Sequence, residues 1–186
     1  MRIGVFGGSF DPIHHGHLIA AVALREALAL DEVRLVVARE QPLKPGGHCA
    51  SPEDRAAMVE LAVEGTPGLR ADRSELARPG PSYMVDTLRR LKSETADAEL
   101  VLLVGADAAS DLDRWREPDV IRALARVEVF TRPGAANAGV PVPAVEISST
   151  GIRARVGAGR TIRYWVPEPV ARYITRHRLY GGRAES

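Results

Sequence analysis

Residues 3–17 read IGVFGGSFDPIHHGH, and this stretch decides the fold. The short apolar run Ile3–Phe6 is partly β-branched and is closed by Gly7 and Gly8, a pattern that predicts a buried strand. A polar loop follows, and the alanine- and leucine-rich residues Leu18–Leu28 then predict a helix with no internal breaker. The opening of the chain is therefore a predicted strand–loop–helix unit.

The same alternation continues along the rest of the chain. Apolar runs predict further strands at residues 33–37, 69–72, 100–104, 127–131 and 145–147. Helical patterns fall at residues 52–63, 83–92, 117–124, 151–156 and 168–177, with Ser51 and Ser82 as caps of the first two. Residues 133–143 read as a surface connection. This alternation indicates an α/β fold, Rossmann-like and doubly wound, with a mostly parallel sheet and helices on both faces.

Composition narrows the class of protein. The chain has 186 residues, 45% of them apolar and 26% charged, which is typical of a single globular domain, here residues 1–186. The formal charge of +1 gives no broad basic field of the kind that binds nucleic acid. No apolar stretch reaches the roughly 18 residues of a membrane span. The lone Cys49 excludes an internal disulfide, and we expect a cytoplasmic protein.

The unusual residues follow the predicted strands. Ligands of parallel sheets sit beyond the carboxyl ends of the strands, and the loops after Phe6, Val37, Val104 and Ile147 all lie at such ends. After Phe6, the glycine pair lets the backbone approach a ligand, and the next helix presents unpaired N–H groups and a positive dipole end. This junction predicts an anion site.

Two histidines accompany that junction. His14 and His17 are three residues apart, so they share a face if the helix starts early, and their N–H groups can donate to phosphate oxygens. The alternatives are a plain turn with structural histidines, or a metal site, for which Asp11 is the one nearby carboxylate. Neither a P-loop nor a G-x-G-x-x-G dinucleotide fingerprint is present.

At this point the motif resembles a known signature. Residues 8–17 are similar to the signature of the nucleotidylyltransferase superfamily, whose core is H-x-G-H, here His14, Gly16 and His17. With the preceding GGSFDP they resemble the bacterial nicotinate-mononucleotide adenylyltransferases. The resemblance recurs in order along almost the whole chain, at residues 81–83, 86–88, 105–107, 115, 132–134, 147–150, 152–153, 166–167, 173–174 and 179–180.

The resemblance implies two halves of an ATP site. His14, His17 and Arg153 are implied as catalytic residues. The implied ATP contacts are Gly7, Gly8, Ser9, Phe10, Gly16, His17, Gly105, Asp107, Ile147, Ser148, Ser149, Thr150 and Arg153. From the residues alone, Ser148–Thr150 reads equally as an ordinary helix cap and Asp107 as a solvated loop acid.

An acceptor site is implied by a second set of residues, namely Asp11, Lys44, Tyr83, Met84, Trp115 and Arg132. A tryptophan face suits a positively charged pyridine ring, and a helix start near Tyr83 suits a carboxylate. Core-edge packing of Trp115, a first-turn role for Tyr83 and a solvated Lys44 are the alternatives. Met84 departs from the family pattern because it stands where threonine is usual.

The implied reaction is transfer of AMP from ATP to nicotinate mononucleotide, which yields nicotinate adenine dinucleotide and pyrophosphate in NAD biosynthesis. Mg²⁺ is expected on the ATP phosphates, with no metal-binding residues in the protein. Alternatives are a nicotinamide-mononucleotide or dual-specificity enzyme, a phosphopantetheine adenylyltransferase, or a non-catalytic nucleotide-sensing module. The expected partners are these two small substrates, with no nucleic acid and no membrane, and with a homo-oligomer as the alternative to a monomer.

Overall fold

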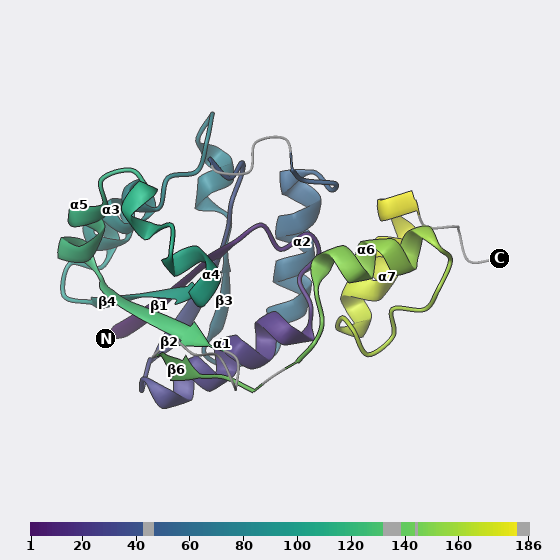
Figure 1. The fold of residues 1–186 in the computed structure, drawn as a ribbon, viewed down its shortest axis with the longest axis horizontal. Helices are drawn as coiled ribbons and strands as arrows, with labels where there is room; N and C mark the ends of the chain where they lie inside the picture. Colours follow the sequence, from purple (N-terminus) through teal and green to yellow (C-terminus); the bar gives the residue numbers. More distant parts are fainter. Residues whose placement is uncertain (43–46, 132–138, 144, 182–186) are drawn as a thin grey trace.

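The computed structural model describes residues 1–42, 47–131, 139–143 and 145–181 (Figure 1). Within them, six strands form one sheet in the order β3-β2-β1-β4-β5-β6, and every neighbouring pair is parallel. The strands are β1 (Arg2–Gly8), β2 (Glu32–Val37), β3 (Leu69–Asp72), β4 (Glu99–Gly105), β5 (Arg126–Thr131) and β6 (Val140–Pro141). The predicted doubly wound α/β fold is confirmed, and the sheet is parallel throughout its described part.

Helices cover both faces of this sheet (Figure 1). The α-helices are α1 (His15–Ala27), α2 (Pro52–Val63), α3 (Met84–Glu94), α4 (Ala106–Ala109), α5 (Pro118–Leu124), α6 (Ser149–Gly157) and α7 (Glu168–Arg176). Short 3₁₀ turns are η1 (Ser74–Ala77), η2 (Leu112–Arg114) and η3 (Leu179–Gly181). None of the helices in the described part of the chain is long and apolar enough to cross a membrane.

The core has one half on each side of the sheet because side chains alternate along every strand. Leu100, Leu102 and Val104 of β4 pack with α3 and α5, whereas Val101 and Leu103 belong to the half that contains α1 and α2. Among the described residues, the large apolar side chains that remain exposed are those of Met1, Val22 and Tyr164. A parallel sheet covered in this way requires strands that are apolar on both faces, which explains why they read as short continuous apolar runs.

The order of the strands fixes where a ligand can bind. From β1 the chain moves outward through β2 to β3, and then returns to β4 on the other side of β1. The strand order therefore reverses between β1 and β4, and the crevice beyond their carboxyl ends is the topological switch point of the sheet. Gly8 ends one of these strands and Gly105 ends the other.

Three details differ from the sequence predictions. Residues 145–147 form no strand, and the last strand is instead Val140–Pro141, inside the predicted surface connection. Helix α1 begins at His15 rather than Leu18, because His14 serves as its N-cap. Ser82 does not cap α3, since its hydroxyl accepts a hydrogen bond from the backbone N–H of Arg39 at 2.8 Å. Ser51 does cap α2, by accepting from Asp54 N.

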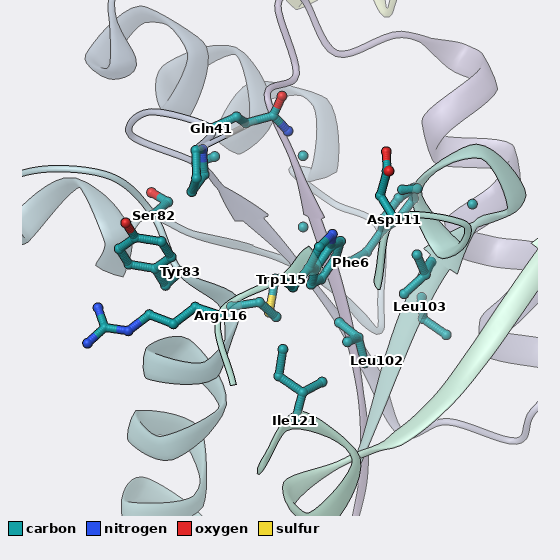
Figure 2. Close-up of a pocket in the computed structure, with 18 of the residues that line it drawn as sticks. Phe6, Gln41, Ser82, Tyr83, Leu102, Leu103, Asp111, Trp115, Arg116 and Ile121 are labelled. Carbon is teal, nitrogen blue, oxygen red and sulfur yellow. The ribbon is translucent and has the colours of Figure 1, made fainter. Parts of the chain in front are cut away.

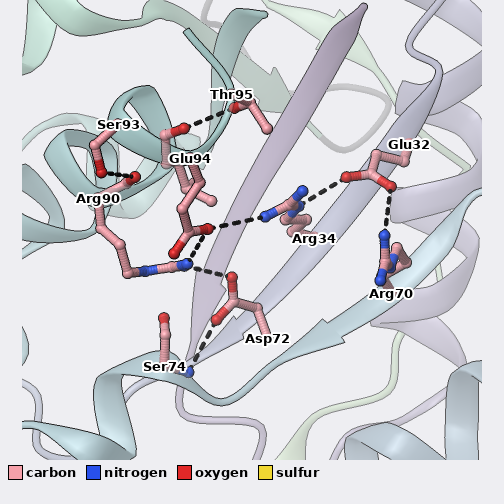
Figure 3. A network of polar contacts seen from close by, with 10 residues as sticks. Glu32, Arg34, Arg70, Asp72, Ser74, Arg90, Ser93, Glu94 and Thr95 are labelled. Carbon is pink, nitrogen blue, oxygen red and sulfur yellow. Dashed lines mark hydrogen bonds and ion pairs between the residues drawn. The ribbon is translucent and has the colours of Figure 1, made fainter.

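A network of charged side chains ties α3 to the outer strands (Figure 3). Arg90 of α3 contacts Asp72 of β3 and Glu94, each at 2.6 Å, and Arg34 of β2 contacts Glu32 at 2.7 Å. Burial would raise the pKa of Asp72, but hydrogen bonds from Ser74 and the neighbouring Arg90 hold it below its usual value. The network fixes the helix whose N-terminus faces the switch point.

The segment that contains α6, α7 and η3 forms a lobe beside α2, on the far side of the molecule from α3 and α5 (Figure 1). The phenol of Tyr173 in α7 donates to Asp54 Oδ1 at 2.9 Å, at the start of α2. Burial and this hydrogen bond raise the pKa of Tyr173 to about 12. The phenol therefore stays a donor across the working pH range.

Candidate active site

The predicted anion loop runs from the end of β1 to the start of α1. Phe10 has a backbone φ of 50° and is only 2% exposed, with its ring edge-on to Phe6 at a centroid distance of 5.9 Å. A left-handed conformation is uncommon for a bulky residue and costs free energy, so the packing of this ring must hold it. The buried ring thereby fixes the path of the loop between Gly8 and the helix.

The two histidines of the motif lie together in the structure. His14 is buried and caps the helix, while His17 lies in the first turn of α1, and their rings stack with centroids 3.7 Å apart. The ring of His17 also meets the rings of Phe6 and Phe10 edge-on, at 6.3 and 5.1 Å. The predicted shared face is confirmed, and the aromatic neighbours fix its orientation.

A segment more than 130 residues later reaches the same loop. Ser149 Oγ donates to the carbonyl of Pro12 at 2.9 Å, and Arg153 Nη1 donates to the carbonyl of Asp11 at 2.7 Å. A Cβ on Gly16 would lie 3.1 Å from the His14 ring and 3.8 Å from the carbonyl of Ile147. Glycine at this position therefore leaves room for the ring of His14, whereas the carbonyl of Ile147 would be in ordinary contact with a Cβ.

The start of α6 places hydroxyl groups and a guanidinium close together. Ser148 caps the helix by accepting from Gly151 N at 3.1 Å, and Arg153 Nη2 donates to Thr150 Oγ1 at 3.2 Å. Helix N-terminal amides and a nearby guanidinium favour phosphate oxygens. The structure thus brings together the two segments that the sequence predicts as the two parts of one phosphate site.

Beside these segments a cavity of about 430 Å³ opens at the switch point (Figure 2). Figure 2 shows Tyr83 and Arg116 at one end and Asp111 at the other, with Phe6 and Trp115 between them. Predicted residues from both halves of the site line it, namely Gly7, Gly8, Tyr83, Met84, Gly105, Asp107 and Trp115. The cavity therefore joins part of the predicted ATP side to part of the predicted acceptor side, whereas His14, His17, Arg153 and the start of α6 are not among the residues that line it.

The acceptor wall is formed where α3 begins. Tyr83 is the N-cap residue of α3, and the guanidinium of Arg116 lies over its ring at 4.8 Å. Met84, the next residue, covers the end of β1, since a Cβ on Gly7 would come within 2.6 Å of Met84 Cε. The thioether therefore occupies the junction between the glycine pair and this wall.

Asp11 does not lie where the prediction put it. Its side chain is 3% exposed, and its carboxylate accepts hydrogen bonds from Cys49 N, Ala50 N and the phenol of Tyr180. These donors occupy both carboxylate oxygens, so the geometry does not support direct contact with an acceptor. Two other predicted acceptor residues, Lys44 and Arg132, lie outside the described residues.

A buried arginine supports the anion loop, and the sequence analysis missed it. Arg55 of α2 is 0% exposed, and its Nη1 donates to the carbonyls of Ser9 and Ala38 at 2.7 Å each. Its other donors reach the carbonyls of Arg39 and Ala50. One guanidinium therefore holds the anion loop, the end of β2 and the start of α2 together.

A second missed residue is a buried carboxyl group at the cavity. Glu75 of η1 is 4% exposed and lines the cavity, and Thr87 Oγ1 donates to it at 2.5 Å. The same hydroxyl accepts from Arg78 at 2.9 Å. Burial raises the pKa of Glu75, against the opposing effect of hydrogen bonds from Thr87 and Ser82.

The described residues do not form a cluster of metal-ligating side chains. Among residues 1–42, 47–131, 139–143 and 145–181, no group of three or more His, Cys, Asp or Glu side chains could hold a metal ion. The donors around the anion loop are instead N–H groups, hydroxyls and a guanidinium, which suit phosphate oxygens. A divalent cation at this site would need most of its ligands from another source.

A doubly wound parallel sheet with an anion loop at its switch point is the arrangement of a nucleotide-binding protein. Comparison with known proteins gives the particular group. Residues 5–155 match the model of the cytidylyltransferase-like family. A relative from Thermomicrobium roseum, named probable nicotinate-nucleotide adenylyltransferase, is 45% identical over 96% of this chain and 91% of its own. One of the same name from Thermus thermophilus is 46% identical over 97% of this chain and 100% of its own.

Solved structures agree on the fold. Nicotinic acid mononucleotide adenylyltransferase of Plasmodium falciparum, complexed with NaAD, superposes with a TM-score of 0.78 at 18% identity and covers 99% of both chains. Its complex with APC gives a TM-score of 0.77 at 17% identity, again over 99% of both chains. By the family match over residues 5–155 and the relatives at 45–46% identity, the chain belongs to the cytidylyltransferase-like family and, within it, to the group of nicotinate-nucleotide adenylyltransferases.

Proposed function

We propose that this protein transfers the adenylyl group of ATP to nicotinate mononucleotide and releases nicotinate adenine dinucleotide and pyrophosphate. The observation that carries the proposal is the cavity at the switch point. The predicted ATP residues Gly8 and Asp107 line it, and so do the predicted acceptor residues Tyr83 and Trp115. One ligand pair can thus meet there with phosphates at the loop and a planar ring at the aromatic wall. Relatives with this activity in their names cover almost the whole chain.

ATP is assigned to the anion loop and the start of α6. His14 and His17 would face the phosphates from one side, and Ser148 and Arg153 from the other. The α6 side is anchored to the backbone of Asp11 and Pro12, in the same loop that leads to the two histidines, which supports their acting as one clamp. Asp107, exposed at the first turn of α4, would accept from the ribose hydroxyls.

The mononucleotide is assigned to the part of the cavity near α3. The indole of Trp115 supplies a flat, electron-rich face for the positively charged pyridine ring. The N-terminal amides of α3, next to Tyr83, would receive the ring carboxylate, and Arg116 adds positive charge beside them. We also infer that the cytoplasm is the compartment, since the exposed free Cys49 suits a reducing environment.

The chemistry needs no strong general base. An oxygen of the mononucleotide 5′-phosphate, which is already ionised, donates an electron pair to the α-phosphorus of ATP. The bond from that phosphorus to the bridging oxygen breaks, and pyrophosphate leaves with its electrons. Catalysis then rests on aligning the two phosphates and on neutralising charge as it builds at the α-phosphate.

Charge neutralisation is assigned to His14, His17, Arg153 and the N–H groups of the Gly8–Ser9 backbone. Mg²⁺ would arrive with ATP, held mainly by phosphate oxygens and water, and would supply further positive charge there. This assignment agrees with the donor chemistry of the loop.

The proposal is tested with ATP, Mg²⁺ and three acceptors in parallel: nicotinate mononucleotide, nicotinamide mononucleotide and phosphopantetheine. We expect the highest kcat/KM for pyrophosphate release with nicotinate mononucleotide. A higher kcat/KM with nicotinamide mononucleotide would mean that the amide, not the acid, is the preferred acceptor. Met84 gives a reason to test this, because its thioether stands where a threonine hydroxyl is usual. ATP binding without pyrophosphate from any acceptor would overturn the enzymatic proposal in favour of a nucleotide-sensing module.

A further inference from the structure

The buried carboxylate of Asp11 joins two distant segments of the chain to the anion loop. Cys49 N donates to its Oδ2 at 2.7 Å, and Ala50 N donates to its Oδ1 at 3.2 Å. The third donor is the phenol of Tyr180, 169 residues away in η3, which reaches Oδ1 at 2.7 Å. At 3% exposure this carboxylate has little access to water, so these protein donors must satisfy it.

The backbone of the same residue carries part of the proposed phosphate clamp. Arg153 Nη1 is held by the carbonyl of Asp11, and Ser149 Oγ is held by the carbonyl of Pro12. Any rotation of the peptide units at these two residues moves both carbonyls. The side-chain anchor of Asp11 and the placement of Arg153 are therefore mechanically linked.

Tyr180 is built to keep its contact. Its backbone lies in the left-handed region, at φ 60° and ψ 25°, and Arg178 two residues earlier has φ 51°. Such conformations in non-glycine residues are strained and persist where surrounding contacts hold them. Burial, and next the hydrogen bond to Asp11, raise the pKa of Tyr180 far above its usual value, so the phenol remains protonated.

A second tyrosine of the same lobe makes a similar bond elsewhere. Tyr173 donates to Asp54 Oδ1 at 2.9 Å, and Asp54 lies in the first turn of α2 and not in the anion loop. Removing either phenol hydroxyl alone would break one hydrogen bond from a tyrosine to an aspartate, between this lobe and the rest of the protein. Only the bond of Tyr180 ends on the motif.

We propose that Tyr180 is a positioning residue that acts through Asp11 to hold the anion loop and Arg153 in the geometry that adenylyl transfer requires. The inference deepens the proposed function and rests on it. The phenol touches neither substrate. It restrains the carboxylate, the carboxylate restrains residues 11 and 12, and their carbonyls set the position of the α6 donors.

The first experiment compares Tyr180→Phe with Tyr173→Phe. A displacement of the clamp donors should reduce kcat of Tyr180→Phe by about 10-fold, because alignment errors of the order of 1 Å reduce turnover steeply. KM for the pyridine mononucleotide should change less than twofold, since the aromatic wall is untouched. Tyr173→Phe should keep kcat within about twofold of wild type while showing a similar fall in Tm. Equal kcat in the two variants would overturn the proposal.

A double-mutant cycle tests whether Tyr180 acts through Asp11. If it does, Asp11→Ala combined with Tyr180→Phe should have the kcat of Asp11→Ala alone, because the phenol has no target once the carboxylate is removed. If the fold-loss of kcat in the double variant equals the product of the losses in the two single variants, Tyr180 affects turnover by another route and the inference is overturned.

Amide hydrogen exchange gives a readout that needs no activity. Exchange at residues 8–17 and 49–50 should accelerate in Tyr180→Phe and remain at the wild-type rate in Tyr173→Phe. Unchanged exchange there in Tyr180→Phe would refute the positioning role even if the wild-type protein proved to be an adenylyltransferase. Accelerated exchange in a protein that releases no pyrophosphate would instead support the mechanical link and overturn the adenylyl-transfer proposal on its own.

Discussion

The imidazole rings of His14 and His17 stack on each other with their centroids 3.7 Å apart and their planes inclined by 24°. One ring belongs to the N-cap of α1 and the other to its first turn, so the backbone of the helix start fixes both. Two rings in such contact cannot reorient independently. They should therefore act on a phosphate group as a coupled pair.

Replacement of His17 tests this pair. His17→Ala should lower kcat by about 10²–10³-fold, the scale for loss of one transition-state donor, with Tm close to wild type. His177 provides the control, since it also stacks on an aromatic ring, that of Tyr173 at 4.0 Å, but lies at the end of α7. His177→Ala should keep wild-type kcat. A folded His17→Ala protein with wild-type turnover would remove His17 from the mechanism.

Arg55 should be among the most important residues for stability. Arg55→Met leaves several buried carbonyls without their donor, and unsatisfied buried groups cost about 1–3 kcal/mol each, so the unfolding free energy should fall by at least about 3 kcal/mol. Urea denaturation measures the change. Arg70→Met is the matched control: the Arg70 side chain is 67% exposed and contacts Glu32 at 3.5 Å, and the loss should stay below about 1 kcal/mol. Equal losses would contradict the supporting role of Arg55.

Gly7 and Met84 should be coupled through their close approach. A Cβ on residue 7 would meet Met84 Cε at 2.6 Å, so the flexible thioether would have to shift within the cavity that it lines. Gly7→Ala should therefore raise KM for the pyridine mononucleotide several-fold, and more than KM for ATP. Adding Met84→Ala should recover most of the loss. If the double variant is worse than Gly7→Ala, the contact is not the cause.

The pH dependence of stability should carry the signature of Glu75. Its pKa is raised in the folded protein by burial, so folding is favoured while the group is protonated and loses that contribution as pH rises through the folded pKa. Glu75→Gln keeps an acceptor for Thr87 and has no charge to bury. The variant should thus gain Tm relative to wild type between pH 4 and pH 8.

Glu60 is the control for that measurement, because its contact with Arg73 at 3.2 Å lies on the surface. Glu60→Gln should show no comparable rise in Tm relative to wild type over the same interval. A Glu75→Gln difference that is constant with pH, or that shrinks as pH rises, would mean that burial does not dominate at this carboxyl group.

Much of the fold is predictable from local patterns. A parallel sheet buried on both faces requires apolar strands, and those at 100–104 and 127–131 agree with β4 and β5. Ser51 and Ser148 cap helices as expected, because the interaction is confined to a few neighbouring residues. Ser82 has the same composition signal, but its hydroxyl bonds to Arg39, 43 residues away. A short stretch of sequence around Ser82 cannot reveal a partner that far away along the chain.

The residues of the candidate site also fall into those that local patterns predict and those that depend on distant partners. Which residues gather at the switch point follows from strand order, and the motif resemblance names most of them. No local pattern predicts the hydrogen bonds of the Asp11 carboxylate, because its partner Tyr180 comes from a distant part of the chain. Arg55 did leave one signal: it is in phase with Met58, Val59 and Ala62 on the buried face of α2, where an arginine must find partners.

The distance along the chain between Asp11 and Tyr180 has a consequence for biosynthesis. Chains are made from the N-terminus, so the histidine motif is translated long before the residue that we propose completes its support. A nascent polypeptide that stops short of residue 180 carries both histidines and lacks the phenol. Under the positioning role proposed for Tyr180, residue 180 must be translated before the nucleotide site can reach its final geometry. Truncated translation products would contain the histidine motif but would turn over more slowly than the full chain.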